Sequence, residues 1–166
     1  MKKHLHNSLR ALFLSLAVLL SLPMLAESVE INGINYWFIP KGKVATVIAK
    51  STGKYSGNIV IPESVEYNGT VCNVTSIGED AFDGCSGLTS VIIPNSVTII
   101  RDYAFYGCAS LSSYQVPNGV QAIGESAFAK CTALSSITLP ERVTLLGEDA
   151  FSGCELLTSI DIPDGV

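Results

Sequence analysis

Residues 81–103 read AFDGCSGLTSVIIPNSVTIIRDY, and the two stretches that follow, 104–126 and 127–149, read AFYGCASLSSYQVPNGVQAIGES and AFAKCTALSSITLPERVTLLGED. All three share one pattern with a period of 23 residues, and each begins with Ala-Phe. The repeated columns are Phe82, Phe105, Phe128 and Phe151; Cys85, Cys108, Cys131 and Cys154; Leu88, Leu111, Leu134 and Leu157; Ser90, Ser113, Ser136 and Ser159; Pro94, Pro117, Pro140 and Pro163; and Val97, Val120, Val143 and Val166. A fixed period of this length is typical of a solenoid built from one coil per repeat.

Each coil is predicted to contain one short strand. The segments LTSVIIP, LSSYQVP, LSSITLP and LTSIDIP place apolar residues at alternate positions and end on a proline, which cannot donate to a strand ladder. Strands stack about 4.8 Å apart, so the Phe and Leu columns should form continuous ladders in the interior. One coil cannot bury its own apolar face, and several stacked coils can.

The segment IGEDAFDGCSGLTSVIIPNSV, residues 77–97, resembles the BspA-like leucine-rich repeat of exported and surface proteins. The resemblance extends from Ile59 to Val166, with departures at Arg101, Lys130 and Tyr114. It implies a leucine-rich repeat solenoid that is mostly β with short one-turn helices. It also implies protein–protein contact and adhesion, without catalytic residues or a cofactor.

The first 26 residues are predicted to be a secretory signal peptide. A basic segment precedes the apolar run Ala11–Leu22, and small residues follow around Ala26. The protein is therefore expected to be secreted or at the cell surface, without a membrane span after removal of the signal. The remaining chain has seven basic and fifteen acidic residues and no histidine. This composition disfavours nucleic-acid binding, histidine-dependent nucleophilic catalysis and histidine-ligated zinc.

Residues 27–73 are predicted to form a β-rich cap, and residues 74–166 to form the repeats, of which the last is incomplete. Asn32-Gly33 and Asn68-Gly69 each lie between apolar strands and predict two hairpins. A solenoid needs terminal units that cover its apolar ends. The last repeat stops at Val166, which predicts either a shortened array or an open coil that self-associates.

Two ladders could carry chemistry. The cysteine column has no C-x-x-C pair, which favours small buried side chains over a metal site, although disulfides between neighbouring coils are geometrically feasible. The acidic column Glu79, Asp102, Glu125 and Glu148 could hold Ca²⁺. Helix capping is favoured instead, because each acid precedes an Ala-Phe pair expected to open a short helix.

The outward positions of the strands vary between coils and are the candidate partner-binding surface. The column contains Ile92, Gln115, Thr138 and Asp161, and one coil adds Tyr103 and Tyr106 where the others lack aromatic residues. Aromatic residues are enriched in binding sites. Such a column is equally typical of an unconstrained solvent face.

Two classes of function follow. The first is an exported module that binds a protein on a host, matrix or neighbouring cell surface. The second is an enzyme that uses the acidic residues, which the sequence disfavours because every coil carries the same carboxylates and none is distinguished as acid or base. A non-catalytic glycan binder and a structural surface repeat protein are the alternatives to the interaction module.

Overall fold

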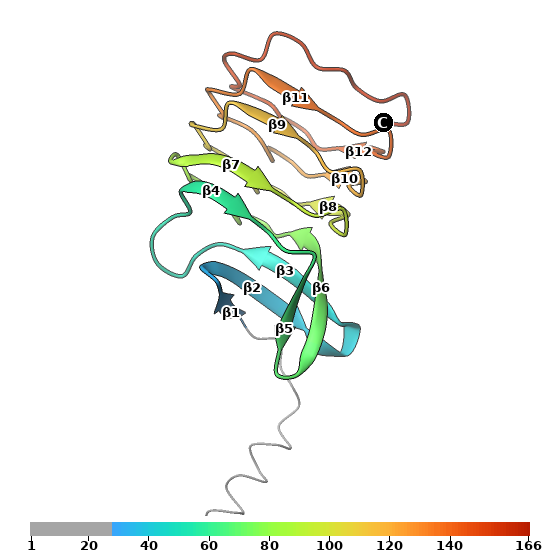
Figure 1. Ribbon diagram of the computed structural model, residues 1–166. Coiled ribbons are helices and arrows are strands. Elements are labelled where there is room, and N and C mark those ends of the chain that lie inside the picture. The colour runs from blue at the N-terminus through green and yellow to red at the C-terminus, as the bar shows by residue number, and fades with distance from the viewer. Residues whose placement is uncertain (1–27) are drawn as a thin grey trace, which may run out of the picture.

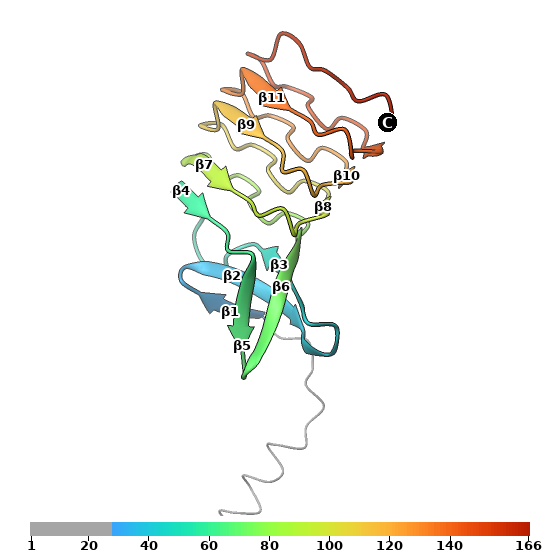
Figure 2. The same ribbon diagram turned by 45° about the vertical axis from the view of Figure 1, so that its right-hand side comes forward.

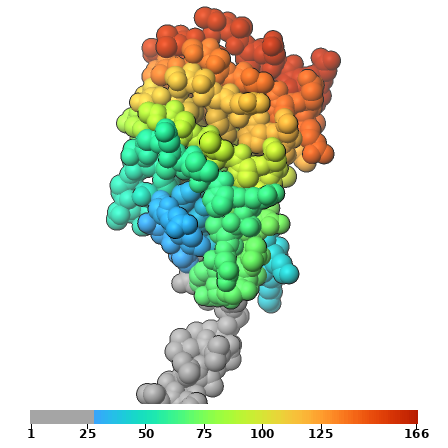
Figure 3. Space-filling view, in the orientation of Figure 1, coloured from blue at the N-terminus to red at the C-terminus, as the bar shows by residue number. Residues whose placement is uncertain are grey.

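The computed structural model describes residues 28–166. Coils are stacked along one axis, with β1 at one end and the chain's last residue in the coil at the other (Figures 1 and 2). The space-filling view shows the coils packed against one another without a break from the blue end to the red end (Figure 3). The signal peptide predicted for residues 1–26 lies outside the described residues. Within residues 28–166, no helix is long and apolar enough to cross a membrane.

One side of the stack, the first wall, is a sheet of eight strands. It begins with the antiparallel strands β1 (Ser28–Ile31), β2 (Ile34–Ile39) and β3 (Val44–Ile48), and continues in parallel through β6 (Thr70–Ile77). The regular coils add β8 (Ile99–Ile100), β10 (Ala122–Ile123) and β12 (Leu145–Leu146). The eighth strand, β5 (Ser64–Tyr67), pairs only with β6.

A second wall holds the strands that the LTSVIIP-type segments predict. It consists of two separate parallel pairs: β4 (Gly57–Val60) with β7 (Leu88–Ile92), and β9 (Ser113–Gln115) with β11 (Ser136–Thr138). Three of the four predicted segments form their strand, as β7, β9 and β11, whereas the fourth, LTSIDIP at 157–163, forms none. The first-wall strands β8, β10 and β12 of the same coils were not predicted. The pairing is interrupted between β7 and β9, because the two pairs form separate sheets.

The two predicted hairpins are present. Asn32 and Gly33 have φ of 50° and 81° and join β1 to β2, while Asn68 and Gly69 have φ of 49° and 73° and join β5 to β6. Positive φ at both turn residues matches the right-handed twist of a hairpin, which explains the Asn-Gly pairs. Whether this region acts as a cap stays a prediction.

The one-turn helices expected at the Ala-Phe pairs are wrong. Helix in the described residues is limited to the 3-10 turn η1 (Pro40–Gly42), and the Ala-Phe segments are tight turns. Alternate backbone N–H groups of these turns bond to the next coil, as in Phe82 N to Ala104 O at 2.8 Å and Phe105 N to Ala127 O at 2.7 Å. An N–H group committed to a neighbouring coil is not free for bonds within a helix. These turns form the third side of each coil, called here the turn wall (residues 78–87, 101–110, 124–133 and 147–156).

The predicted aromatic ladder fills the interior. Ring centroids of Phe82 and Phe105 are 5.0 Å apart, those of Phe105 and Phe128 are also 5.0 Å apart, and those of Phe128 and Phe151 are 5.7 Å apart. The interplanar angles of 4°, 9° and 16° show that the rings are stacked. Tyr55 continues the ladder beyond Phe82 at 4.8 Å, outside the regular period that predicts the other rings.

Candidate functional site

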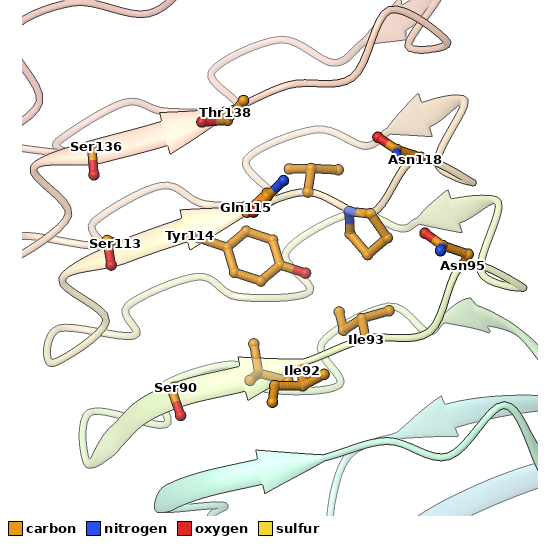
Figure 4. Close-up of a pocket in the computed structure, with 13 residues that line it drawn as sticks. Ser90, Ile92, Ile93, Asn95, Ser113, Tyr114, Gln115, Asn118, Ser136 and Thr138 are labelled. Carbon is orange, nitrogen blue, oxygen red and sulfur yellow. The ribbon is translucent and has the colours of Figure 1, made fainter.

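A groove of about 550 Å³ lies on the second wall, at the interruption between β7 and β9 (Figure 4). Three of the predicted site residues, Ile92, Gln115 and Thr138, line it together. All three side chains are exposed. The regular stacking of the strands therefore brings residues that are 23 positions apart in the sequence to one surface feature.

Tyr114 is the residue that distinguishes the interrupted part of the wall. Its column is otherwise aliphatic, with Val91 and Ile137 on the neighbouring strands. The Tyr114 ring packs against Phe105 and Phe128, with centroid separations of 5.8 and 5.4 Å. A phenol is longer than an aliphatic side chain, and Tyr114 lines the groove at which the pairing of β9 with β7 is missing. The departure at Tyr114 thus coincides with the missing strand pairing.

The lining of the groove is uncharged, and eight of its thirteen residues carry a polar side chain. It includes no Lys, Arg, Asp, Glu or His. Its polar side chains are three carboxamides and four hydroxyls in addition to that of Tyr114: Asn95, Gln115, Asn118, Ser90, Ser113, Ser136 and Thr138. Such a surface suits a neutral ligand that both donates and accepts hydrogen bonds.

Tyr103 and Tyr106 lie elsewhere, on the turn wall, and neither lines the groove. Their ring centroids are 5.8 Å apart, and both side chains are partly exposed. The Tyr103 hydroxyl donates to Glu125 Oε1 at 2.8 Å, and this bond raises the pKa of Tyr103. Lys130 Nζ lies 5.1 Å from the centroid of the Tyr106 ring. Five of the six candidate residues therefore fall into two separate surfaces.

Asp161, the last residue of the outward column, joins neither surface. It is exposed in the final coil, beyond the last strand of the second wall, and it does not line the groove. At the other end of the column, Val60 pairs in register with Ile92. The two apolar side chains are 63% and 60% exposed. They make an apolar rim beside the groove.

The acidic ladder does not cap helices, so that prediction is wrong. Asp102 Oδ1 accepts a hydrogen bond from the backbone N–H of Glu125 in the next coil at 2.9 Å. Glu125 in turn accepts from Tyr103. These carboxylates join neighbouring coils because the turns they precede are not helical. Within the described part of the chain, no group of three or more His, Cys, Asp or Glu side chains is placed to hold a metal ion.

The cysteine ladder is structural. Cys85, Cys108, Cys131 and Cys154 are buried free thiols, as is Cys72 in β6. The Sγ atoms of Cys108, Cys131 and Cys154 lie 3.1–3.2 Å from the carbonyl oxygen of the Phe in the preceding coil. Burial raises the pKa of all four ladder thiols, that of Cys131 to about 12. A protonated, buried thiol is a poor nucleophile and a poor metal ligand.

Several residues that line the groove were not predicted from the sequence as site residues. Asn95 and Asn118 follow the strand-ending prolines Pro94 and Pro117 at the same repeat position. Their shared position was a signal that both lie on one side of neighbouring coils. The buried position of Tyr114 was recognisable from its column, but the interruption beside it was not.

Comparisons with known proteins agree with the geometry. The family model of the BspA type leucine-rich repeat region matches residues 58–166 with six copies. No curated protein sequence matches the chain. A leucine-rich repeat protein of T. pallidum is 27% identical, with a TM-score of 0.69 over 84% of this chain and 73% of that chain.

Two other solved structures are longer. A leucine-rich cell surface protein of Faecalibacterium prausnitzii is 29% identical, with a TM-score of 0.65 over 88% of this chain and 44% of that one. A leucine-rich repeat protein of Bacteroides ovatus is 28% identical, with a TM-score of 0.58 over 82% of this chain and 41% of that one. This chain therefore spans less than half the length of either. The repeat pattern, the stacked coils and the family model that covers more than half of the chain lead to one assignment: the chain belongs to the BspA-type leucine-rich repeat family.

Proposed function

We propose that this chain is an exported, non-catalytic interaction module that presents its repeat ladder to a protein on a host, matrix or neighbouring cell surface. The observation that carries the proposal is the combination of a repetitive interior with side chains that vary from coil to coil on the outside. Ile92, Gln115 and Thr138 project from equivalent backbone positions and share no chemistry. A rigid frame with variable side chains is the arrangement that a solenoid uses for recognition.

Export is supported by the signal-like first 26 residues and by the likeness to a protein described as a cell surface protein. The non-catalytic part of the proposal is supported by the equivalence of the coils. Each carries the same kind of carboxylate at the same turn, and residues 27–166 contain no histidine. Nothing distinguishes one carboxylate as a general acid and another as a base.

The test is binding of purified matrix and cell-surface proteins to the immobilised protein and to the double variant Tyr103→Ser/Tyr106→Ser. We expect the variant to bind its protein ligand at least about tenfold more weakly, equivalent to about 1.4 kcal/mol. The reason is that interfaces depend on a few aromatic side chains. The melting temperature should stay close to that of the parent, because both residues are partly exposed.

A matched control replaces two exposed side chains of the first wall, Ile99→Ser and Leu145→Ser, whose exposed fractions are 38% and 54%. This control should retain binding. Equal binding by both double variants would place the partner site away from Tyr103 and Tyr106. Hydrolysis of a glycan or peptide by the purified protein would contradict the interaction function itself.

The proposal includes self-association through the last coil. Leu156, Ile162 and Val166 of the last coil are 56%, 45% and 49% exposed. A second copy would bury these apolar side chains. Sedimentation at rising protein concentration should show dimers that Leu156→Ser weakens, and a purely monomeric profile would argue against this contact.

A further inference from the structure

The Tyr114 hydroxyl is buried and has no hydrogen-bond partner. The Tyr114 side chain is only 7% exposed, and burial raises its pKa. A buried hydroxyl without a partner is unusual, because the water that it gave up on folding is not replaced. Figure 4 shows this hydroxyl pointing away from β9, toward Ile93 and Asn95, within the lining of the groove. An unused donor is therefore aimed into the interruption of the second wall.

The interruption also leaves two strand edges facing each other. β7 pairs only with β4, and β9 pairs only with β11. A strand edge carries backbone N–H and C=O groups that can bind an extended chain. On the first wall of the same coils, β8 and β10 are paired. The opening is thus confined to the wall that presents the variable outward residues.

The side chains around the opening match the chemistry of a peptide backbone. A carboxamide carries one carbonyl and one N–H₂ group, so Asn95, Gln115 and Asn118 can each pair with a peptide group as donor and acceptor. No charged side chain lines the groove, so neither an anion nor a cation finds a counter-charge. The volume of about 550 Å³ lies in the range of sites that hold small ligands.

We propose that the groove between β7 and β9 binds a short, uncharged, extended segment of a partner protein, with the Tyr114 hydroxyl donating to a main-chain carbonyl of that segment. One apolar side chain of the segment packs on the rim formed by Val60 and Ile92. This inference rests on the proposed function, because it specifies the part of a protein ligand that the second wall recognises.

A neutral sugar is the competing ligand, and two observations disfavour it. The Tyr114 ring is packed between Phe105 and Phe128, so it offers no exposed face for a sugar ring. The exposed large apolar side chain in the lining is the aliphatic Ile92, and Val60 lies beside it on β4. Aliphatic side chains beside a strand edge can pack against the side chains of an extended peptide that binds there.

The first experiment uses an array of short peptides built from Gly, Ala, Val, Ile, Ser, Thr, Asn and Gln, with acetylated and amidated ends. We expect the purified protein to bind a subset of them, and to lose that binding when the peptide nitrogens are methylated. Gln115→Ala should weaken binding by about tenfold. The matched control is Gln121→Ala, an exposed glutamine of the same coil just before β10, which should leave binding unchanged.

The second experiment tests the hydroxyl directly with Tyr114→Phe, which keeps the ring. Removal of an unpartnered buried hydroxyl should leave the melting temperature equal or higher, while peptide affinity falls by about tenfold. That opposite movement of stability and affinity distinguishes a binding role from a structural one. Unchanged peptide affinity in Tyr114→Phe would overturn the proposal.

Two further outcomes count against it. Displacement of the peptides by uncharged oligosaccharides, or binding of those sugars alone through Gln115, would identify a glycan site instead. Failure of every capped neutral peptide, while protein capture still depends on Tyr103 and Tyr106, would overturn this inference and leave the proposed function standing. If the parent protein captured no protein and bound no peptide, both the proposed function and this inference would be overturned.

Discussion

Phe105 occupies the middle of the aromatic stack, with Phe82 and Phe128 each 5.0 Å from its ring centroid. Replacing it by Ala should lower the free energy of unfolding by about 3–5 kcal/mol, because the surrounding coils cannot collapse into the space. Urea unfolding would measure the loss. Leu145→Ala, at a side chain that is 54% exposed, is the control and should change stability by no more than about 0.5 kcal/mol. A small effect of Phe105→Ala would show that the ring ladder is not the core.

The Cys131 thiol links stability to pH. Its pKa rises from the ordinary value of 9.0 to about 12 through burial. Folding therefore gains stability from this thiol below pH 9.0, and that gain is lost as the pH rises from 9.0 to about 12. The loss should approach about 1.4 kcal/mol for each pH unit. Urea unfolding at pH 8 to 11 should show a shallower decline in Cys131→Ala than in the parent, and identical slopes would contradict the assignment.

At the scale of the element, the turns of neighbouring coils pack closely. At certain glycines they leave no room for a side chain. A Cβ atom on Gly147 would lie 2.3 Å from Glu125 N and 2.4 Å from the carbonyl carbon of Gly124. Both neighbours are backbone atoms, so neither can rotate away. Gly147→Ala should therefore lower the melting temperature strongly. Gly33→Ala meets no atom within 4 Å and strains only its positive φ, so it should cost about 1 kcal/mol. A small effect of Gly147→Ala on the melting temperature would mean that neighbouring coils can move apart to make room for the methyl group.

The second wall makes a further element-scale prediction. If the phenol of Tyr114 separates β9 from β7, Tyr114→Ile should restore the aliphatic column of Val91 and Ile137 and allow the two strands to pair. Slower hydrogen exchange of the β7 and β9 backbone amides would measure the new pairing. The same rates in parent and variant would show that the interruption has another cause.

These elements also show how far the sequence reasoning reached. The strands β7, β9 and β11, the Phe ladder and the buried cysteines followed from the period, because identical residues in stacked coils occupy similar environments. The strand expected at 157–163 is absent. Helices were wrongly expected at the Ala-Phe pairs, since local capping patterns do not reveal that Phe82 N bonds to Ala104 O of the next coil. The groove was not predicted either. The period shows which residues are neighbours, but it does not show whether their strands form hydrogen bonds.

For the whole molecule, the repeat is the unit that can be removed. Deletion of residues 104–126 joins Tyr103 to Ala127 in the same phase of the repeat. We expect this shortened protein to fold, with a far-UV circular dichroism spectrum of the same shape. Its melting temperature should be lower, because one coil and one interface between coils are lost. It should also lose the groove, since β7 would meet β11 and their aliphatic residues Val91 and Ile137. An unfolded product would show that the coils are not independent units.

Under mechanical tension, this molecule is expected to unfold in steps. Because each coil contacts only its neighbours, tension between the two ends peels coils away singly, beginning at the weaker end. A released coil of 23 residues extends to roughly 80 Å, whereas the same coil adds 5.0 Å to the length of the stack. A chain that unfolds in this way would lengthen greatly under load, which limits the peak force at its points of attachment. Stretching single molecules between two handles would record this behaviour as a series of evenly spaced extensions.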